Sequence, residues 1–250
     1  MNKPDTAFPS THPARGYLHV AEVLRREIRS MGVGGGGRLP SERELTRLLK
    51  ISRTSLREAL IVLELQGEID IRVGSGIYLK EVQHPEAEEP AAVAASEADD
   101  GRLGQSPREV NQARYFLESG VAAHAARFMT RAQLRDLGAA LSDMRRALRQ
   151  RKRRGDQPLA DADGRFHMVL AAAADNELVS RLLRDLFDQR YSPVGGSMHR
   201  LFDNETVWQD AIQEHQDIYD AVVSRDPLQA QAAMQRHLSR AYARLMAVIG

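Results

Sequence analysis

Apolar residues recur at helical spacing in three segments near the N-terminus, and this pattern predicts three helices. The predicted helices cover Tyr17–Met31, a short segment that starts after Ser41, and Arg53–Gln66. Ser41 and Glu44 have the spacing of a capping box, in which each side chain bonds the other residue's backbone N–H group. Only three residues separate the second helix from the third, so these two helices predict a helix-turn-helix.

Two short apolar runs follow the third helix and flank a glycine-rich turn. Gly67 is expected to end the helix, as glycine does at many helix C-termini. Strands are expected at Ile69–Val73 and Ile77–Leu79, with Gly74-Ser75-Gly76 as the turn of a hairpin. Upstream, Gly34–Gly37 predicts a floppy loop, because four glycines are costly to order. Helix-turn-helix and hairpin together predict a winged helix-turn-helix.

From Ser106 onward the helical period continues almost to the C-terminus. Ser106 and Pro107 predict the start of a helix, and Thr130 with Gln133 forms a capping box that opens a second one, ending near Arg149. Further helices are expected at residues 159–174, 176–191, 206–224 and 226–249, with a loop at 151–158 and a break at 192–196. Six or seven helices with short connections predict an antiparallel all-α bundle, so the fold class is mainly α.

Charge divides the chain into parts. Residues 1–80 carry 13 basic and 9 acidic side chains, whereas residues 81–107 carry 1 basic and 7 acidic ones. The acidic stretch is rich in alanine and interrupted by prolines, so it predicts a linker without fixed structure. The predicted organisation is a flexible tail at 1–15, a winged helix-turn-helix domain at 16–80, an acidic linker at 81–106 and a helical domain at 107–250.

Composition also excludes several classes of protein. The 250 residues include no cysteine, which excludes disulfides and thiolate metal sites and fits a reducing cytoplasm. No segment approaches the roughly 18 continuous apolar residues of a membrane span, and the first residues lack the apolar run of a signal peptide. We therefore expect a cytoplasmic protein without a membrane partner.

Basic residues gather on the predicted helix-turn-helix. Six Lys or Arg lie between Arg38 and Arg57, against two acidic residues. Arg53 and Arg57 are four apart and share one helix face, and an arginine fork can bind guanine O6 and N7 together. Ser52 and Thr54, at the start of that helix, suit phosphate oxygens. The pattern predicts a helix that enters the major groove of double-stranded DNA; a solvated basic helix pair is the alternative.

In PSERELTRLLKISRTSLREAL and in the wing LQGEIDIRVGSGIYL, the chain resembles the DNA-binding signature of the GntR family of bacterial transcription regulators. The resemblance implies that Arg43, Arg53 and Arg57 contact bases and backbone. It also implies that Gly74, at the tip of the wing, approaches the minor groove. Thr46 departs from the family pattern, which more often has alanine there, and this difference should matter little.

Four residues of the helical domain have the spacing of a metal site. Asp163 and His167 are four apart, so both side chains project from one helix face. His215 and His237 lie at nearly equal distances from a predicted turn at 225–226, which places them at one height on adjacent antiparallel helices. Three imidazoles and a carboxylate suit a divalent metal with open positions. From spacing alone, surface or core roles for these histidines stay open.

The helical domain also resembles the FCD effector domain of FadR-type GntR regulators. The matching residues are Arg114 with Glu118, Asp163 with His167, His215, and His237 with Leu238. The resemblance implies that the aspartate and the three histidines bind zinc, or nickel or manganese instead, beneath a small carboxylic acid. Arg114 would clamp the carboxylate, and Arg190 is a second candidate for that role. A surface ion pair between Arg114 and Glu118 is the alternative.

Several segments look most like the regulators of hexuronate catabolism (the ExuR and UxuR group): REALIVLELQGEIDIRVGSGIY, RYFLESGVAAHAA, QRYSPV and SRDPLQAQAAMQRHLSRA. This implies a sugar-acid effector such as a hexuronate, an aldonate or an aldarate; lactate, pyruvate or another small carboxylate are alternatives. We expect a homodimer that represses from a palindromic operator and is released by its effector. A metal-sensing regulator is another alternative, and an enzyme is the poorest one because no motif supplies a general base.

Overall fold

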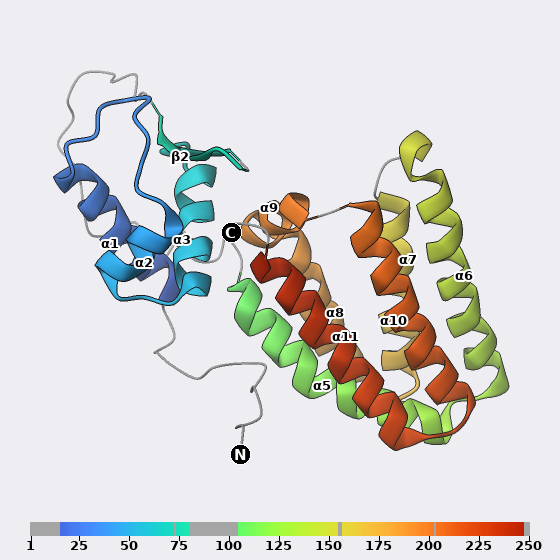
Figure 1. Cartoon of the computed structure of the whole chain (residues 1–250). Coiled ribbons are helices and arrows are strands. Elements are labelled where there is room, and N and C mark those ends of the chain that lie inside the picture. The colour runs from blue at the N-terminus through green and yellow to red at the C-terminus, as the bar shows by residue number, and fades with distance from the viewer. Residues whose placement is uncertain (1–15, 73, 81–104, 155–156, 203, 248–250) are drawn as a thin grey trace, which may run out of the picture. The chain divides into compact units, whose positions relative to one another are not determined.

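The computed structural model describes residues 16–72, 74–80, 105–154, 157–202 and 204–247 (Figure 1). The predicted tail at 1–15 and most of the predicted linker at 81–106 lie outside these residues. The chain divides into two compact units, which we call the head unit and the bundle unit. The head unit contains Met1–Arg108, Tyr191–His199 and Met246–Gly250, and the bundle unit contains Glu109–Arg190 and Arg200–Leu245.

Three helices of the head unit match the predicted ones: α1 Gly16–Ser30, α2 Glu42–Leu49 and α3 Arg53–Leu65. The predicted capping box is present, since the Ser41 hydroxyl accepts from the Glu44 N–H and the Glu44 carboxylate accepts from the Ser41 N–H. The side of α3 that packs on the unit is fully buried and apolar, with Leu56, Leu60 and Leu63 among its residues. The helix-turn-helix prediction is confirmed.

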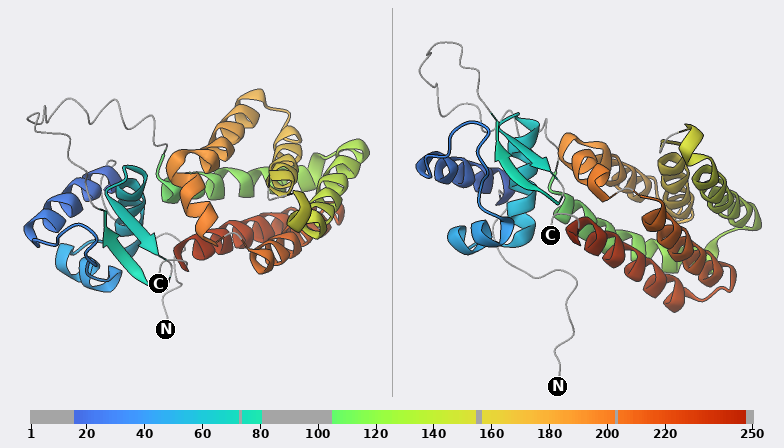
Figure 2. Two further views of the ribbon diagram at one scale, coloured as in Figure 1. Left: turned by 90° about the horizontal axis from the view of Figure 1, so that it is seen from above. Right: turned by 45° about the horizontal axis from the view of Figure 1, so that its top comes forward.

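The predicted wing is also present. Strand β1 (Ile69–Arg72) pairs antiparallel with β2 (Gly76–Leu79), and the two arrows lie side by side in Figure 2. Gly74 has φ +74° and Gly76 has φ +130°, backbone conformations that favour glycine, which explains the glycine-rich turn. Val73, the predicted last residue of the first strand, lies outside the described residues.

The glycine loop before α2 is more ordered than predicted. The Gly36 N–H donates to the Leu79 carbonyl over 2.7 Å, and the Leu79 N–H donates to the Gly37 carbonyl over 2.9 Å. The loop therefore lies along the edge of β2 that β1 does not use. Gly36 has φ +78°, so glycine lets the chain turn toward this edge. The expectation of a floppy loop at Gly34–Gly37 was wrong, because backbone hydrogen bonds to a strand offset the entropy cost of ordering it.

Seven α-helices follow in the described residues after 105, at the upper end of the predicted number. They are α5 Pro107–Phe128, α6 Arg131–Arg154, α7 Gln157–Ala172, α8 Glu177–Asp188, α9 Pro193–Phe202, α10 Glu205–Val223 and α11 Pro227–Ala247. A short 3-10 turn, η1 (Gln189–Tyr191), links α8 to α9. In the bundle unit α6 packs against α7 and α10, around a core that includes Met144, Phe166 and Ile218. None of the described helices is both long enough and apolar enough to cross a membrane.

Two predicted interruptions are helical in the structure. Helix α6 continues to Arg154 and α7 starts at Gln157, so most of the predicted loop at 151–158 is helical, and residues 155–156 lie outside the described residues. Residues 145–151 consist of strong helix formers. The predicted break at 192–196 is shorter than expected, because α9 begins at Pro193 and only Ser192 separates it from η1. The Ser192 hydroxyl accepts from the Gly195 N–H over 3.2 Å, so Ser-Pro acts here as a cap and first helical residue.

The carboxylate of Glu58, on α3, accepts hydrogen bonds from residues at the start of α5. The buried Glu58 accepts hydrogen bonds from the Ser106 hydroxyl over 2.6 Å and from the Arg108 N–H over 3.2 Å. The first N–H groups of a helix lack partners within it and favour negative charge, so Glu58 stabilises this end of α5. All three residues belong to the head unit.

Candidate metal centre and DNA-reading surface

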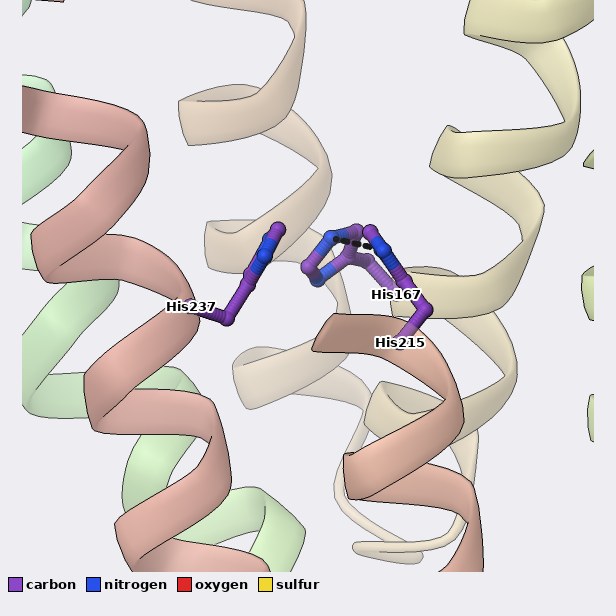
Figure 3. A group of neighbouring side chains, drawn as sticks. All are labelled: His167, His215 and His237. Atoms are coloured by element: carbon purple, nitrogen blue, oxygen red, sulfur yellow. Dashed lines mark hydrogen bonds between the residues drawn. The ribbon is translucent and has the colours of Figure 1, made fainter. Parts of the chain in front are cut away.

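Three helices of the bundle unit each bring one buried histidine to a common point (Figure 3). His167 comes from α7, His215 from α10 and His237 from α11, and one ring nitrogen of each lies within 4.8 Å of the others. The Nε2 atoms of His215 and His167 are 3.2 Å apart. The ring centroids of His215 and His237 are 4.4 Å apart, so the prediction that they share one height is confirmed.

The fourth predicted ligand lies at the same point. Oδ1 of Asp163 is 3.1 Å from Nε2 of His215 and 3.8 Å from Nε2 of His167, and the side chain is buried. The other oxygen, Oδ2, accepts a hydrogen bond from Arg190. The structure thus brings together all four residues that the spacing singled out. Their ability to bind a metal stays a prediction.

An acceptor faces the outer ring nitrogen of every histidine. Nδ1 of His167 bonds the Glu118 carboxylate, Nδ1 of His215 bonds the carbonyl of Ala211 over 2.6 Å, and Nδ1 of His237 bonds the Glu214 carboxylate over 2.9 Å. A proton on each Nδ1 satisfies these acceptors and leaves a lone pair on each Nε2, toward the common point. Histidines that bind metals in proteins are held in this way. Sequence reasoning did not find Glu214 or Ala211, although both lie within four residues of His215.

Burial favours the neutral form of His167 and His237. Burial lowers the pKa of His167, and burial together with His215 lowers the pKa of His237 to about 3. Burial alone would raise the pKa of Glu214, but hydrogen bonds from Arg244 and His237 outweigh it and hold this pKa at about 2. Neutral imidazoles beside ionised carboxylates are the protonation states that a divalent cation requires of its ligands.

Arg114, on α5, forms an incomplete ion pair beside the histidines. Its Nε donates to Glu118, and both side chains are buried, so the surface pair considered from the sequence is instead internal. Burial would raise the pKa of Glu118, but Arg114 and His167 keep it below its usual range. Among the described residues, Nη2 of Arg114 finds no hydrogen-bond partner. A buried N–H group without an acceptor is costly, so this atom suits an anionic ligand.

Arg190, the second predicted clamp, contacts the candidate metal site directly. It lies in η1 and donates to Oδ2 of Asp163. Burial would raise the pKa of Asp163, but the positive charge of Arg190 outweighs it and holds this pKa well below its usual range. Arg190 therefore keeps Asp163 ionised and fixes its orientation.

The head unit exposes most of the residues predicted to contact DNA. Ser52 is the N-cap of α3, and its hydroxyl accepts from the Ser55 N–H over 3.1 Å. Arg53 follows it and is exposed, as is Arg43 on α2; Thr54 is half-buried. Gly74 is exposed in the wing turn. These positions are compatible with the predicted contacts to bases and phosphates, which stay predictions.

Arg57 is the exception. Its side chain is 5% exposed, and its Nε and Nη2 donate to the Glu42 carboxylate over 2.9 and 3.1 Å. The guanidinium therefore connects α3 to α2 and does not extend toward solvent beside Arg53. In this conformation Glu42 holds the guanidinium, and the expected contact of Arg57 with DNA stays a prediction. Glu42, on the neighbouring helix, offers acceptors for two of the three guanidinium nitrogens inside the unit.

Two family models match segments of this chain. Residues 16–79 match the family model "Bacterial regulatory proteins, gntR family", and residues 109–240, more than half of the chain, match the model "FCD domain". The Uxu operon transcriptional regulator of Escherichia coli (strain K12) is 30% identical over 241 residues, which cover 95% of this chain and 89% of that protein. The Exu regulon transcriptional regulator of the same organism is 31% identical over 233 residues, covering 91% and 83%.

A solved structure, Streptococcus agalactiae GntR, aligns with a TM-score of 0.46 and 24% identity over 91% of this chain and 99% of that one. The relatives are transcription regulators and not enzymes, in agreement with the prediction from the sequence. The second matched region contains Asp163 and all three clustered histidines. The chain belongs to the GntR family of bacterial transcription regulators, in the group that carries an FCD domain and includes the Uxu and Exu regulators.

Proposed function

We propose that this protein is a metal-containing repressor that binds operator DNA as a homodimer and leaves it when a small sugar acid binds. The observation that carries the proposal is the convergence of three imidazole nitrogens and one carboxylate oxygen beside Nη2 of Arg114, a buried atom without a hydrogen-bond partner among the described residues. Such a site suits an anion that contacts a metal and an arginine together. The protein would act in the cytoplasm, where bacterial operator DNA lies.

The donor set supports a divalent metal. His167, His215, His237 and Asp163 offer three imidazole nitrogens and one carboxylate oxygen, a set that suits zinc, with nickel or manganese as alternatives. The lowered pKa values of His167 and His237, and the outer hydrogen bonds of all three histidines, are those expected of metal ligands. A bound ion would supply a positive centre for the carboxylate and hydroxyl oxygens of a sugar acid.

The effector class is supported by two observations. Nη2 of Arg114 lacks an acceptor among the described residues, and a carboxylate is the strongest acceptor for a buried guanidinium. The chain also resembles hexuronate regulators, and its relatives include proteins named for the Uxu operon and the Exu regulon. A hexuronate is therefore the first candidate, before aldonates and aldarates. The effector can release the protein only if it binds one arrangement of the dimer better than the other.

The residues that would contact operator DNA lie on the exposed part of the head unit. Arg53 would contact a base, Arg43 the backbone, and Ser52 with Thr54 a phosphate at the start of α3. The wing would place Gly74 near the minor groove. Two such heads would match the two halves of a palindromic site.

The homodimer is supported by an exposed apolar stripe on α5. Phe116 is 65% exposed, Phe128 is 63% exposed, and Gly120 lies between them with open space at the position of a Cβ. A glycine inside a helix costs about 1 kcal/mol relative to alanine, and nothing within its own unit requires it. A second copy whose helix crosses here would bury both rings and approach closely at Gly120.

Light scattering tests this stripe. Phe116→Glu should convert the dimer into a monomer at micromolar concentration, because two like charges would face each other in the interface. Glu109→Gln, at the start of the same helix, serves as a control for a change of charge. A Phe116→Glu protein that stays dimeric contradicts the assignment of the interface to α5.

A release assay tests the function as a whole. An operator is first selected from random double-stranded DNA, and fluorescence anisotropy then follows its binding to zinc-loaded protein. D-galacturonate or D-glucuronate should release the DNA, and acetate should not at equal concentration. Release by L-lactate or pyruvate instead would change the effector class. Release by zinc alone, without any acid, would identify a metal sensor.

A further inference from the structure

Two arginines beside the histidine cluster stack on one aromatic ring. The Cζ atom of Arg114 lies 5.2 Å from the ring centroid of Phe187, and the Cζ atom of Arg190 lies 4.7 Å from it. Phe187 is buried near the end of α8, and its ring centroid is 5.8 Å from that of His167. Side chains from α5, α7 and η1 therefore meet at this ring. Spacing in the sequence did not single it out.

Gly164 on α7 allows the ring to lie there. A Cβ at this position would be 2.8 Å from Cε1 and 3.1 Å from Cζ of Phe187, so any other residue would have to displace the ring. Glycine inside a helix is unfavourable, and here the close approach of Phe187 explains it. Because Gly164 directly follows Asp163, the ring is held against the helix segment that carries the candidate metal ligand.

Stacking restrains a guanidinium without using its hydrogen-bond donors. Attraction between the cation and the ring face fixes the plane of the group, whereas an additional acceptor would consume an N–H. Glu118 accepts a hydrogen bond from Nε of Arg114, and the Phe187 ring restrains the plane of the guanidinium. Nη2 has no hydrogen-bond partner among the described residues. The arrangement holds Arg114 rigidly and still leaves one donor for a ligand.

We propose that Phe187 is a positioning residue that sets the spacing and orientation of Arg114 and Arg190 for the carboxylate of the effector, with Gly164 as the gap that admits its ring. The proposal rests on the proposed function, because it assumes a carboxylate effector at this site. It assigns Phe187 an influence on effector affinity through the arginines, without a contact between Phe187 and the metal.

Three variants of the full chain test the proposal, with zinc content and thermal unfolding measured first. Phe187→Leu keeps an apolar side chain but removes the ring face, and Gly164→Ala pushes the ring from its place. Leu183→Val, one turn earlier on α8 and also buried, is the matched control. We expect all three to retain zinc. The dissociation constant for D-galacturonate, measured by calorimetry, should rise at least tenfold in the first two and less than threefold in the control.

A double variant separates positioning from general loss of structure. If Phe187 acts through Arg114 as well as Arg190, then Phe187→Leu should weaken binding by a clearly smaller factor in the Arg114→Lys background than in the unaltered chain, because only Arg190 is left to be positioned. Losses that multiply in the double variant, or a Phe187→Leu protein that binds D-galacturonate as tightly as the unaltered chain, would overturn the proposal.

A measurement without effector keeps the two proposals distinct. The Nε–H proton resonances of Arg114 and Arg190, assigned by Arg→Lys substitution, should show an upfield shift from the ring that disappears in Phe187→Leu. If this shift is absent in the unaltered protein, the positioning role fails whatever the effector is. If the shift is present but D-galacturonate, L-lactate and pyruvate all fail to bind, the proposed function fails and Phe187 is left with orienting the arginines alone.

Discussion

Each unit of this protein buries an arginine–glutamate pair, and the two pairs differ in what they leave unbonded. In the head unit, Arg57 uses both Nε and Nη2 on the Glu42 carboxylate. In the bundle unit, Arg114 uses Nε on Glu118, shares that carboxylate with His167, and has Nη2 without a partner among the described residues. The first pair connects two helices, whereas the second leaves a buried donor that suits the proposed carboxylate ligand.

The difference matters because the sequence suggested the same kind of role for both arginines. Arg57 was expected to contact DNA and Arg114 to contact a carboxylate. Taking a guanidinium out of water is costly, and the cost is offset only when its donors find acceptors. The N–H donors that a buried arginine leaves without an acceptor therefore say more about ligand binding than its burial or its sequence motif does.

The largest effect is expected when the Arg57–Glu42 pair is broken. Arg57→Met leaves the Glu42 carboxylate, which is only 12% exposed, without its partner, and should lower the free energy of unfolding of the head unit by about 3 kcal/mol. Urea unfolding measures this change. Adding Glu42→Leu should recover much of the stability, because the buried charge is then gone as well. A stable Arg57→Met protein that has lost operator binding would restore the base-contacting role of Arg57.

Bound zinc should raise the free energy of unfolding of the bundle unit and leave that of the head unit unchanged. At a free zinc concentration about 100 times the dissociation constant, we expect a stabilisation of about 3 kcal/mol. His215→Ala should abolish that gain and reduce bound zinc, measured by mass spectrometry, to less than a tenth of the original. His124→Ala, a half-buried histidine outside the cluster, is the control. Zinc content unchanged in His215→Ala would show that the ion binds elsewhere.

Arg53 is the exposed arginine of α3, four residues before the buried Arg57. Arg53→Ala should weaken operator binding by about 1–3 kcal/mol and relax the preference at one base pair, with little change in stability. Arg43→Ala should weaken all DNA sequences about equally and reduce the salt dependence of binding. Anisotropy titrations on the selected operator and on its point variants distinguish the two outcomes. Unchanged affinity in Arg53→Ala would remove the arginine from the interface.

The smallest expected effect concerns pH in the zinc-free protein. Burial lowers the pKa of folded His237 to about 3, whereas an unfolded histidine titrates near 6.5, so the unfolded state takes up the proton first. Its contribution to stability is complete well above pH 6.5 and declines as the pH falls toward 3, by about 1 kcal/mol between pH 6.5 and 5.5. Fluorescence of Trp208, the one tryptophan, reports unfolding of the bundle unit. His237→Gln should flatten this slope.

Local signals in the sequence were sufficient for most helix starts and for the four clustered ligands. Ser41 and Thr130 cap the helices that follow them, and Ser106-Pro107 marks the start of α5. A four-residue spacing or an equal distance from a turn places side chains together whatever the rest of the fold does. Ser192-Pro193 shows the limit of such signals. The same two residues can stop one helix or start another, and only the structure distinguishes these outcomes.

Contacts between helices could not be predicted in the same way. Phe187 meets Arg114 because of how α8 and α5 are rotated about their axes, and no spacing within either helix encodes that rotation. Arg57 faces Glu42 for the same reason, although its distance from Arg53 predicted a shared exposed face. Phe187 and Glu214 were missed because their roles depend on partners that are distant in the sequence.

The glycine loop along β2 has a consequence for the protein in a crowded cell. A two-stranded sheet has two edges whose unpaired backbone groups can recruit a strand from another chain and begin aggregation. Here Gly36 and Gly37 occupy the edge of β2, and the Glu64 carboxylate accepts the Ile71 N–H at the edge of β1. The wing can therefore be presented to DNA, where copies of the protein gather, without offering a template for amyloid-like pairing.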